Sequence, residues 1–242
     1  MTDTAHAYVA LGDSISIDDY SGGPGRGGAS LLFRNHDADF PQWKGRDLLT
    51  RQPDLTFKLL ATDGATTGTL LSAQLPRLAA LGVRPTLVTL TIGGNDVLSA
   101  YGDTRAARRV IADVQAATAL ALARLQPLLA AGAQVVVGTV YDPSDGTADA
   151  ARLGLPPWPD AVAVIAELNQ ALREVAGQHG ATVAEIGAHF LGHGVQAGNP
   201  AQPHARPAQR ELWFCSVIEP NAWGASGVRE AFWAALSPSP AS

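Results

Sequence analysis

The residues of this sequence that are best suited to chemistry stand in three short glycine-containing blocks. Gly12-Asp13-Ser14 offers a hydroxyl, Gly64 a backbone N–H without a side chain, and Gly93-Gly94-Asn95-Asp96 a side-chain amide. Acyl transfer needs such a set, because a hydroxyl attacks the carbonyl carbon while neutral donors stabilise the oxygen that becomes negative. Ser14 is therefore the candidate nucleophile.

The first block also has a purely structural interpretation. Asp and Ser side chains bond readily to nearby backbone, so Gly-Asp-Ser is ordinary in turns. The spacing Gly12-x-Ser14-x-Ser16 lacks the second glycine of the nucleophile elbow of α/β-hydrolases, which counts against that fold. The elements around the three blocks must therefore decide between the two interpretations.

Each block directly follows an apolar run, which predicts that strands deliver all three. Strands alternate with helices along the chain, as is typical of a parallel sheet with helices on both faces. The carboxyl ends of such strands share one edge, where ligands bind. We expect strands at 7–12, 55–61, 85–92, 134–140 and 181–186. We expect helices at 41–51, from Thr66 or Thr67 as the N-cap to about 81 with a kink or break at Pro76, at 104–131 as one helix or as two divided by Pro127, at 160–178 and at 222–236.

The composition indicates one large domain that acts on a small molecule. A chain of 242 residues with 46% hydrophobic residues buries a substantial core, and no linker or repeat divides it. We expect a single domain over 1–242, irregular at 187–220 and frayed at 237–242. A net charge of −5 without like-charge runs argues against nucleic-acid and membrane partners.

Neither a cofactor nor a metal is expected. Cys215 is the only cysteine, so disulfides within the chain and multi-cysteine metal sites are excluded. The glycine-rich loop at 21–28 matches neither the phosphate-binding nor the dinucleotide-binding spacing. No apolar run reaches membrane-spanning length and no signal peptide is recognisable, so a cytoplasmic location is expected. Either a monomer or a small homo-oligomer is compatible with the sequence.

Taken together and in this order, the blocks resemble the SGNH, or GDSL-type, hydrolase superfamily. The resemblance covers nearly the whole chain and implies a flavodoxin-like three-layer α/β/α sandwich with a five-stranded parallel sheet. It implies that Ser14 is the nucleophile, and that the Ser14 N–H, the Gly64 N–H and the Asn95 side chain form the oxyanion hole. Asp13, Gly94 and Asp96 would then lie at the substrate site, although Asp96 alternatively fixes local backbone or the Ser14 loop.

The last block departs from the family pattern Asp-x-x-His-Pro-x-x-x-Gly. Glu219 stands where the family has the general base His, and Ser216 stands where it has the orienting Asp. Glu219 itself is one candidate base, provided that burial raises its pKa well above the ordinary value of about 4.3. The other candidate is a histidine from the preceding segment, first His193 and then His189 or His204, with Glu219 as its orienter.

The predicted function is that of a serine hydrolase, which cleaves carboxylic esters through an acyl-enzyme on Ser14. Two alternatives stay open. The first is deacetylation of carbohydrate, which uses the same chemistry. The second is a protein that has lost catalysis and binds an acyl or sugar ligand in the same cleft. Tyr141, Trp158 and Trp223 either line the pocket or fill the core.

Overall fold

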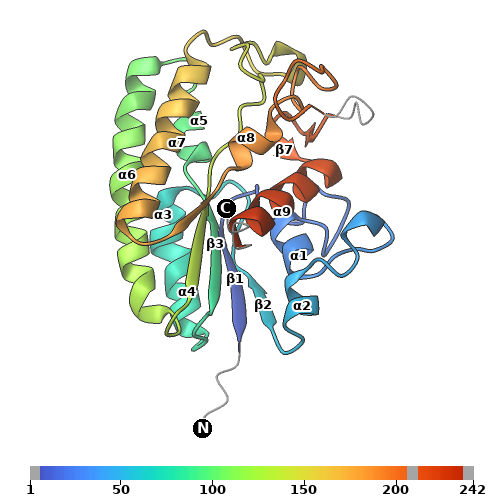
Figure 1. Cartoon of the computed structure of the whole chain (residues 1–242). Coiled ribbons are helices and arrows are strands. Elements are labelled where there is room, and N and C mark those ends of the chain that lie inside the picture. The colour runs from blue at the N-terminus through green and yellow to red at the C-terminus, as the bar shows by residue number, and fades with distance from the viewer. Residues whose placement is uncertain (1–5, 206–211, 237–242) are drawn as a thin grey trace, which may run out of the picture.

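A computed structural model describes residues 6–205 and 212–236, so the expected frayed tail at 237–242 lies outside the described residues. Five parallel strands form the main sheet in the order β2-β1-β3-β4-β5, which confirms the predicted sheet (Figure 1). The strands are β1 (Ala7–Gly12), β2 (Thr56–Leu59), β3 (Leu87–Thr91), β4 (Gln134–Gly138) and β5 (Thr182–Ala184).

Helices cover both faces of this sheet, as Figure 1 shows, and each face has its own apolar core. Helices α6 and α7 pack against each other on one side, and α1, α8 and α9 gather on the other. The first side comprises α3 (Thr67–Thr69), the π-helical segment η2 (Leu70–Gln74), α4 (Leu75–Ala80), α5 (Gly94–Leu98), α6 (Thr104–Leu125) and α7 (Ala161–Gln178). The second comprises α1 (Gly28–Phe33), α2 (Leu48–Arg51), α8 (Ile186–Phe190) and α9 (Ala222–Leu236).

The burial of each strand follows from its place in the sheet. All six residues of β1 and all five of β3 are buried, because helices cover both faces of these central strands. At the edge, β2 alternates between exposed and half-buried residues. In the order 2-1-3-4-5 the direction of winding reverses between β1 and β3, and ligands bind at this switch point in doubly wound sheets.

The structure corrects several predicted boundaries. The helix predicted at 41–51 is a short 3₁₀ turn (Pro41–Trp43) followed by α2, and α6 ends at Leu125 because Pro127 allows only a 3₁₀ turn (Gln126–Leu128). The segment at 187–220 was expected to be irregular. Part of it is ordered as α8 and as an antiparallel pair, β6 (Phe214–Cys215) and β7 (Glu219–Pro220).

Two short helices, α1 and α5, were not predicted at all. Both start in glycine-rich sequence, which disfavours helix. In α1 the glycine permits close packing, because a β-carbon on Gly28 would come within 2.6 Å of Val228 in α9. Tertiary packing against α9 therefore offsets the low helix preference of the segment. Within the described ranges, no helix combines the length and the apolar character that a membrane span requires.

Candidate active site

Ser14 lies on the first turn after β1, at the carboxyl edge of the sheet. Gly12 has a φ of 118°, and a β-carbon there would lie 1.8 Å from the Thr91 carbonyl oxygen, so only glycine fits. The Asp13 N–H donates to that same oxygen at 3.0 Å, and the Asp13 carboxylate accepts from the Ile15 N–H at 3.2 Å. These bonds fix the turn on β3, and Ser14 keeps 7% of its surface exposed.

Gln74 holds the end of β1 from the helical side. Its side-chain oxygen accepts from the Gly12 N–H and its amide nitrogen donates to the Gly12 carbonyl, both at 2.8 Å. The amide also donates to the Thr62 hydroxyl at 3.2 Å, and so it links β1 to the turn after β2. Gln74 ends the π-helical segment η2, and nothing in the sequence pattern distinguishes it from any other helical glutamine.

The turn with Gly64 and the helix with Asn95 are joined by side chains of the third block. The Asn95 amide donates to the Ala65 carbonyl at 3.0 Å. The Asp96 carboxylate accepts from the Thr67 hydroxyl at 2.7 Å and from the Thr67 N–H at 3.1 Å. The turn after β2 is thereby tied to the start of α5. Because β1 lies between β2 and β3, both blocks flank Ser14.

The three predicted oxyanion donors have hydrogens to spare. Among residues 6–205 and 212–236, no group accepts from the backbone N–H of Ser14 or of Gly64. The Asn95 amide nitrogen carries two hydrogens and uses one on Ala65. Gly64 is exposed and has a φ of 64°, and a β-carbon there would touch nothing within 4 Å. Backbone conformation therefore favours glycine at position 64, whereas crowding does not demand it.

The side chain next to the Ser14 hydroxyl is that of Glu219, which accepts a hydrogen bond from it. Burial, chiefly, raises the pKa of Glu219, the bond from Ser14 opposes this, and the charge of Asp63 raises the pKa further. The second carboxylate oxygen, Oε2, is buried and has no hydrogen-bond partner in the described part of the chain. Such an oxygen favours the protonated form, and Glu219 therefore accepts a proton at a higher pH than an ordinary glutamate.

A strained turn presents Glu219. In the hairpin between β6 and β7, Ser216 and Val217 have φ values of 43° and 75°, and the Ile218 N–H donates to the Ser216 carbonyl at 3.0 Å, as in a γ-turn. Positive φ is especially unfavourable for β-branched Val217. The Tyr141 hydroxyl donates to the Ile218 carbonyl at 2.6 Å and fixes the strand that carries Glu219.

Another acidic residue, Asp63, completes this group of side chains. It accepts a hydrogen bond from the Tyr20 hydroxyl, and its charge acts on Glu219. Tyr20 is held in turn by its carbonyl, which accepts from the Cys215 thiol at 3.6 Å. Neither Tyr20 nor Asp63 belongs to a recognisable sequence motif. The only available signal was the position of Asp63 directly before Gly64.

His193 lies in an aromatic cluster and is fully buried. Its ring stacks on Trp213 with centroids 3.5 Å apart and planes at 9°, and its Nε2 forms a hydrogen bond with the His204 carbonyl at 3.1 Å. His189 pairs with Glu230 at 3.0 Å. These contacts are those of histidines that hold the 189–204 segment in place, and the base role of His193 stays a prediction.

Asp13 and Asp96 support the site from behind. Asp13 is 1% exposed, and burial above all raises its pKa from 3.8 to about 7, against hydrogen bonds from Thr91 and Ile15, with a contribution from the nearby charge of Glu219. Asp96 is occupied by Thr67. Gly94 begins α5 and is half-buried. Both carboxylates therefore position the backbone of the three blocks.

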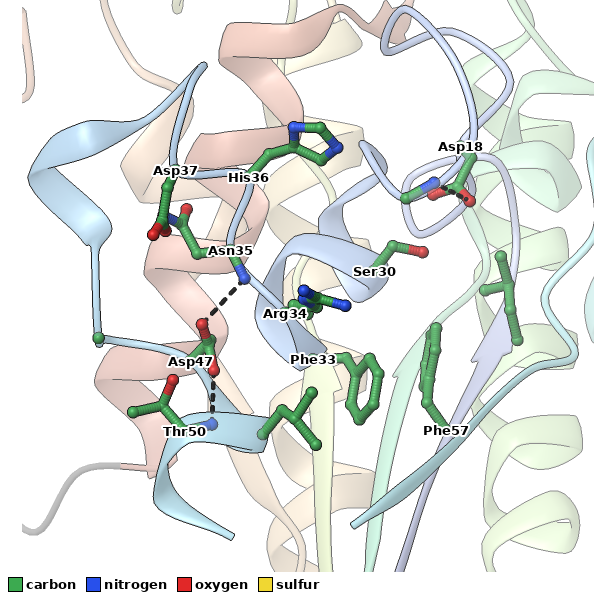
Figure 2. A pocket seen from close by; sticks show the side chains of 14 residues that line it. Asp18, Ser30, Phe33, Arg34, Asn35, His36, Asp37, Asp47, Thr50 and Phe57 are labelled. Atoms are coloured by element: carbon green, nitrogen blue, oxygen red, sulfur yellow. Dashed lines mark hydrogen bonds between the residues drawn. The ribbon is translucent and has the colours of Figure 1, made fainter. Parts of the chain in front are cut away.

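A hollow of about 1070 Å³ lies between α1, the segment before α2 and the edge strand β2 (Figure 2). It is separate from the residues described above. Figure 2 shows Phe33 and Phe57 side by side and Asp47 bonded to Asn35 and Thr50. None of the predicted catalytic residues lines it. The volume of a hollow therefore does not locate the chemistry in this fold.

Comparison with known proteins identifies the family of the chain. The model of the GDSL-like Lipase/Acylhydrolase family matches residues 10–224. No relative was found among the curated proteins.

Several solved structures have a similar fold. One is the extracellular lipase of Streptomyces rimosus, with a TM-score of 0.61, 24% identity, and coverage of 96% of this chain and 100% of that chain. The acetylxylan esterase Axe2 of Geobacillus stearothermophilus has a TM-score of 0.65 and 15% identity, over 97% and 95% of the two chains. Phospholipase A1 of Streptomyces albidoflavus NA297 has a TM-score of 0.59 and 22% identity, over 96% and 99%. The TM-scores show that the fold is shared, and at identities below 25% the likeness shows the fold alone.

Proposed function

We propose that this chain, which belongs to the GDSL-like Lipase/Acylhydrolase family and is an ester-cleaving hydrolase, acts through an acyl-enzyme. The ester is a carboxylic ester, and the acyl group is carried by Ser14. The observation that carries the proposal is the hydrogen bond between Ser14 and Glu219. It joins a hydroxyl at a sheet edge to a carboxylate whose pKa is raised. The proposed oxyanion donors Gly64 and Asn95 follow strands that neighbour β1 in the sheet. A nucleophile within hydrogen-bond reach of its base is the expected arrangement for acyl transfer.

In the first step the Ser14 oxygen attacks the ester carbonyl carbon and its proton passes to Glu219. The carbonyl oxygen becomes negative and is stabilised by the N–H groups of Ser14, Gly64 and Asn95. When the intermediate collapses, the bond to the alcohol oxygen breaks and Glu219 returns the proton to that oxygen. Water then attacks the acyl-enzyme in the same way, giving up a proton to Glu219, and the carboxylic acid leaves as Ser14 is regenerated.

Glu219 takes the role of base ahead of a His193/Glu219 pair. The pKa of Glu219 is shifted by burial, by the hydrogen bond from Ser14 and by the charge of Asp63. No histidine contributes to this shift. A raised pKa brings the carboxylate closer to the operating pH, where a general base is most effective. His193 in turn is enclosed by Trp213 and bonded to the His204 carbonyl.

Three substitutions test these roles, with short aryl esters as substrates. Ser14→Ala is expected to abolish hydrolysis, and Glu219→Gln to lower kcat by about 10²–10⁴, the usual contribution of a general base. His193→Phe preserves the stacking on Trp213 and is expected to retain activity. Full activity of Ser14→Ala refutes the nucleophile, and loss of activity in a folded His193→Phe variant moves the base role back to that histidine.

A protein that only binds ligands is the opposing hypothesis. A fluorophosphonate probe distinguishes it from an enzyme, because the probe reacts only with an activated serine. Labelling of Ser14 that disappears in Glu219→Gln supports catalysis. An ordered protein that is not labelled at Ser14 supports binding alone.

Carbohydrate deacetylation is the second candidate activity, since one protein of similar fold, Axe2, is an acetylxylan esterase. Removal of an acetyl group uses the same nucleophile and oxyanion hole. Release of acetate from acetylated xylooligosaccharides, compared with release from simple aryl acetates, decides between the two. A cytoplasmic location and a monomeric or small oligomeric state stay predictions, which cell fractionation and light scattering test.

A further inference from the structure

We propose that Tyr20 is a positioning residue for ester hydrolysis, because its hydroxyl holds the Asp63 carboxylate beside Glu219. This inference rests on the proposed function, in which Glu219 is the base. Tyr20 stands in the loop 18–27, whose glycine-rich sequence fits neither phosphate binding nor dinucleotide binding. The role of this loop is to hold the tyrosine at the edge of the Ser14 site.

The loop is closed on itself by the Asp18 side chain. One carboxylate oxygen accepts from the Gly25 N–H at 2.9 Å, and the other accepts from the Gly27 N–H at 2.8 Å. The Ser21 N–H donates to the Asp18 carbonyl at 3.1 Å, which places Tyr20 at the third position of a β-turn. Because both ends of the loop are bonded to one side chain, Tyr20 has a defined place.

The loop is also fixed to the rest of the fold. A β-carbon on Gly27 would lie 2.0 Å from the Ile17 carbonyl oxygen, so two stretches of backbone meet there without a side chain between them. The Tyr20 carbonyl accepts from the Cys215 thiol at 3.6 Å. Cys215 belongs to β6, in the same hairpin as Glu219. The tyrosine and the proposed base are therefore held by one piece of structure.

The Tyr20 hydroxyl keeps its proton under working conditions. Burial first, then the hydrogen bond with Asp63 and the charges of Asp63, Glu219 and Asp19, raise the pKa of Tyr20 to about 12. A phenol in this state is a permanent hydrogen-bond donor near neutral pH. Asp63 itself is exposed, so its side chain is free to turn into water when that donor is missing.

The surroundings contain no cation that would offset the charge of Asp63. The titratable groups that interact with Glu219 or Tyr20 are Asp13 after β1, Asp19 in the loop, Asp63 after β2, Tyr141 after β4 and Cys215 in β6. In the described part of the chain, no lysine, arginine or histidine is among the groups that shift the pKa of Glu219 or Tyr20. The place of Asp63 therefore bears directly on the proton affinity of Glu219.

Tyr20→Phe tests the role of the hydroxyl, because it keeps the ring and removes the donor. With Asp63 turned into water, the pKa of Glu219 should fall. The acid limb of kcat/KM for an aryl acetate is expected to move to lower pH by about half a pH unit, a size typical of a partly exposed pair of like charges. An acid limb that stays in place or moves upward overturns the proposal.

A double variant separates positioning from a direct effect of the hydroxyl. If Tyr20 acts only through Asp63, Tyr20→Phe combined with Asp63→Asn has the same acid limb as Asp63→Asn alone. Additive displacements overturn the proposal. At 1 M NaCl, charges are screened beyond about 3 Å, so the acid limb of the unmodified enzyme should move towards that of Tyr20→Phe. Equal movement of both proteins with salt counts against the proposal.

The contribution of the loop is tested through Asp18, which is not among the groups that shift the pKa of Glu219. Asp18→Ala removes both acceptors that close the loop and should displace the acid limb in the direction of Tyr20→Phe. Asp18→Asn loses the same charge but keeps an oxygen that accepts one N–H, so it should displace the limb less. Equal displacement in the two variants attributes the effect to charge and refutes the role of the loop.

Tyr101→Phe is the matched control. Tyr101 is another half-buried tyrosine, and its hydroxyl donates to the Pro156 carbonyl at 2.5 Å. Its removal should leave the acid limb unchanged. A displacement equal to that of Tyr20→Phe would make the effect a general one of lost tyrosine hydroxyls and overturn the specific role of Tyr20.

A titration without turnover separates this proposal from the proposed catalysis. Carbon-13 NMR of the Glu219 side-chain carboxyl, assigned by its loss in Glu219→Gln, gives the pKa directly, and this pKa should be lower in Tyr20→Phe. If the unmodified protein cleaves no ester but the pKa falls in this way, hydrolysis fails and the link from Tyr20 through Asp63 to Glu219 stands. Ester cleavage together with an unchanged pKa of Glu219 refutes the positioning role alone.

Discussion

Asp96 binds Thr67 through both the backbone N–H and the hydroxyl of that residue. The pair connects the helix that carries Asn95 to the turn that carries Gly64, so the two proposed oxyanion donors, which follow different strands, share one support. A donor contributes to catalysis only when it points at the position of the developing charge. We therefore expect Asp96 to affect the reaction through the placement of Gly64.

Loss of this support should lower kcat more than it raises KM. Asp96→Ala is expected to reduce kcat about 10- to 100-fold, less than the 10²–10³ lost when a donor itself is removed. Asp96→Asn keeps one acceptor and should recover part of the activity. Steady-state kinetics on an aryl acetate provide the measurement.

Asp103→Ala is the control for that prediction, because Asp103 also accepts a backbone N–H, from Ala106, as the N-cap of α6. Its loss should cost about 1 kcal/mol of stability and leave kcat unchanged. If both variants lose activity in proportion to stability, Asp96 has no specific role at the site.

The pH dependence of hydrolysis should respond to Asp63. Glu219 must be ionised to accept the proton of Ser14, so activity rises as pH passes its raised pKa. The negative charge of Asp63 raises that pKa, and Asp63→Asn should therefore move the acid limb of the profile to lower pH. A kcat/KM profile from pH 4 to 9 measures the displacement. An acid limb that moves upward, or one that stays in place, contradicts the assignment of Glu219 as base.

Asp13 should make the protein less stable as pH rises from about 4 to about 7. Its pKa of about 7 in the fold exceeds the value of 3.8 for the unfolded chain, so the folded state binds the extra proton in this interval, and ionisation is unfavourable above it. The displacement corresponds to at most about 4 kcal/mol. Asp13→Asn should be more stable than the unmodified protein at pH 8 and less dependent on pH.

Urea unfolding at pH 4.5 and pH 8 tests this effect. Asp145, whose pKa burial raises to about 6, contributes with the same sign and remains in the variant, so the dependence is reduced and not abolished. A variant whose stability falls with pH as steeply as that of the unmodified protein rules out Asp13 as the source.

Relief of the strained turn should stabilise the fold and impair catalysis. Val217 has a φ of 75°, a conformation that costs a β-branched residue about 1–3 kcal/mol, whereas glycine adopts it freely. Val217→Gly is expected to gain about 1 kcal/mol in denaturant unfolding. Because the turn then holds Glu219 less rigidly, kcat should fall severalfold. Val217→Ala keeps most of the strain and should show no gain, and a gain equal to that of glycine would argue against strain.

The sequence predicted the scaffold because its strands are strongly apolar. The runs that became β1 and β3 are buried on both faces, and the blocks after them could therefore be assigned to one edge. Thr66 was one of two predicted caps, and it caps α3 with a reciprocal bond from Thr69. Local pattern suffices where a residue's role depends on its own strand or turn.

Roles that depend on distant partners were harder to predict. His193 was predicted only from its position in the segment before Glu219, and its stacking on Trp213, 20 residues further along the chain, could not be predicted from that position. Glu219 was one of two candidate bases, and only the folded chain shows that it bonds to Ser14. Gln74 and Asp63 belong to no recognisable sequence motif. Their partners, Gly12 for Gln74 and Glu219 for Asp63, lie on other elements of the fold.

The pairing of Ser14 with Glu219 joins the turn after the first strand to the last segment before α9, so the proposed site unites groups 219 − 14 = 205 positions apart in the sequence. A ribosome that adds about 5–20 residues per second places the second group roughly 10–40 s after the first. Throughout that interval the nascent chain carries the proposed nucleophile without its proposed base. We therefore expect products that stop before residue 219 to be inert towards esters.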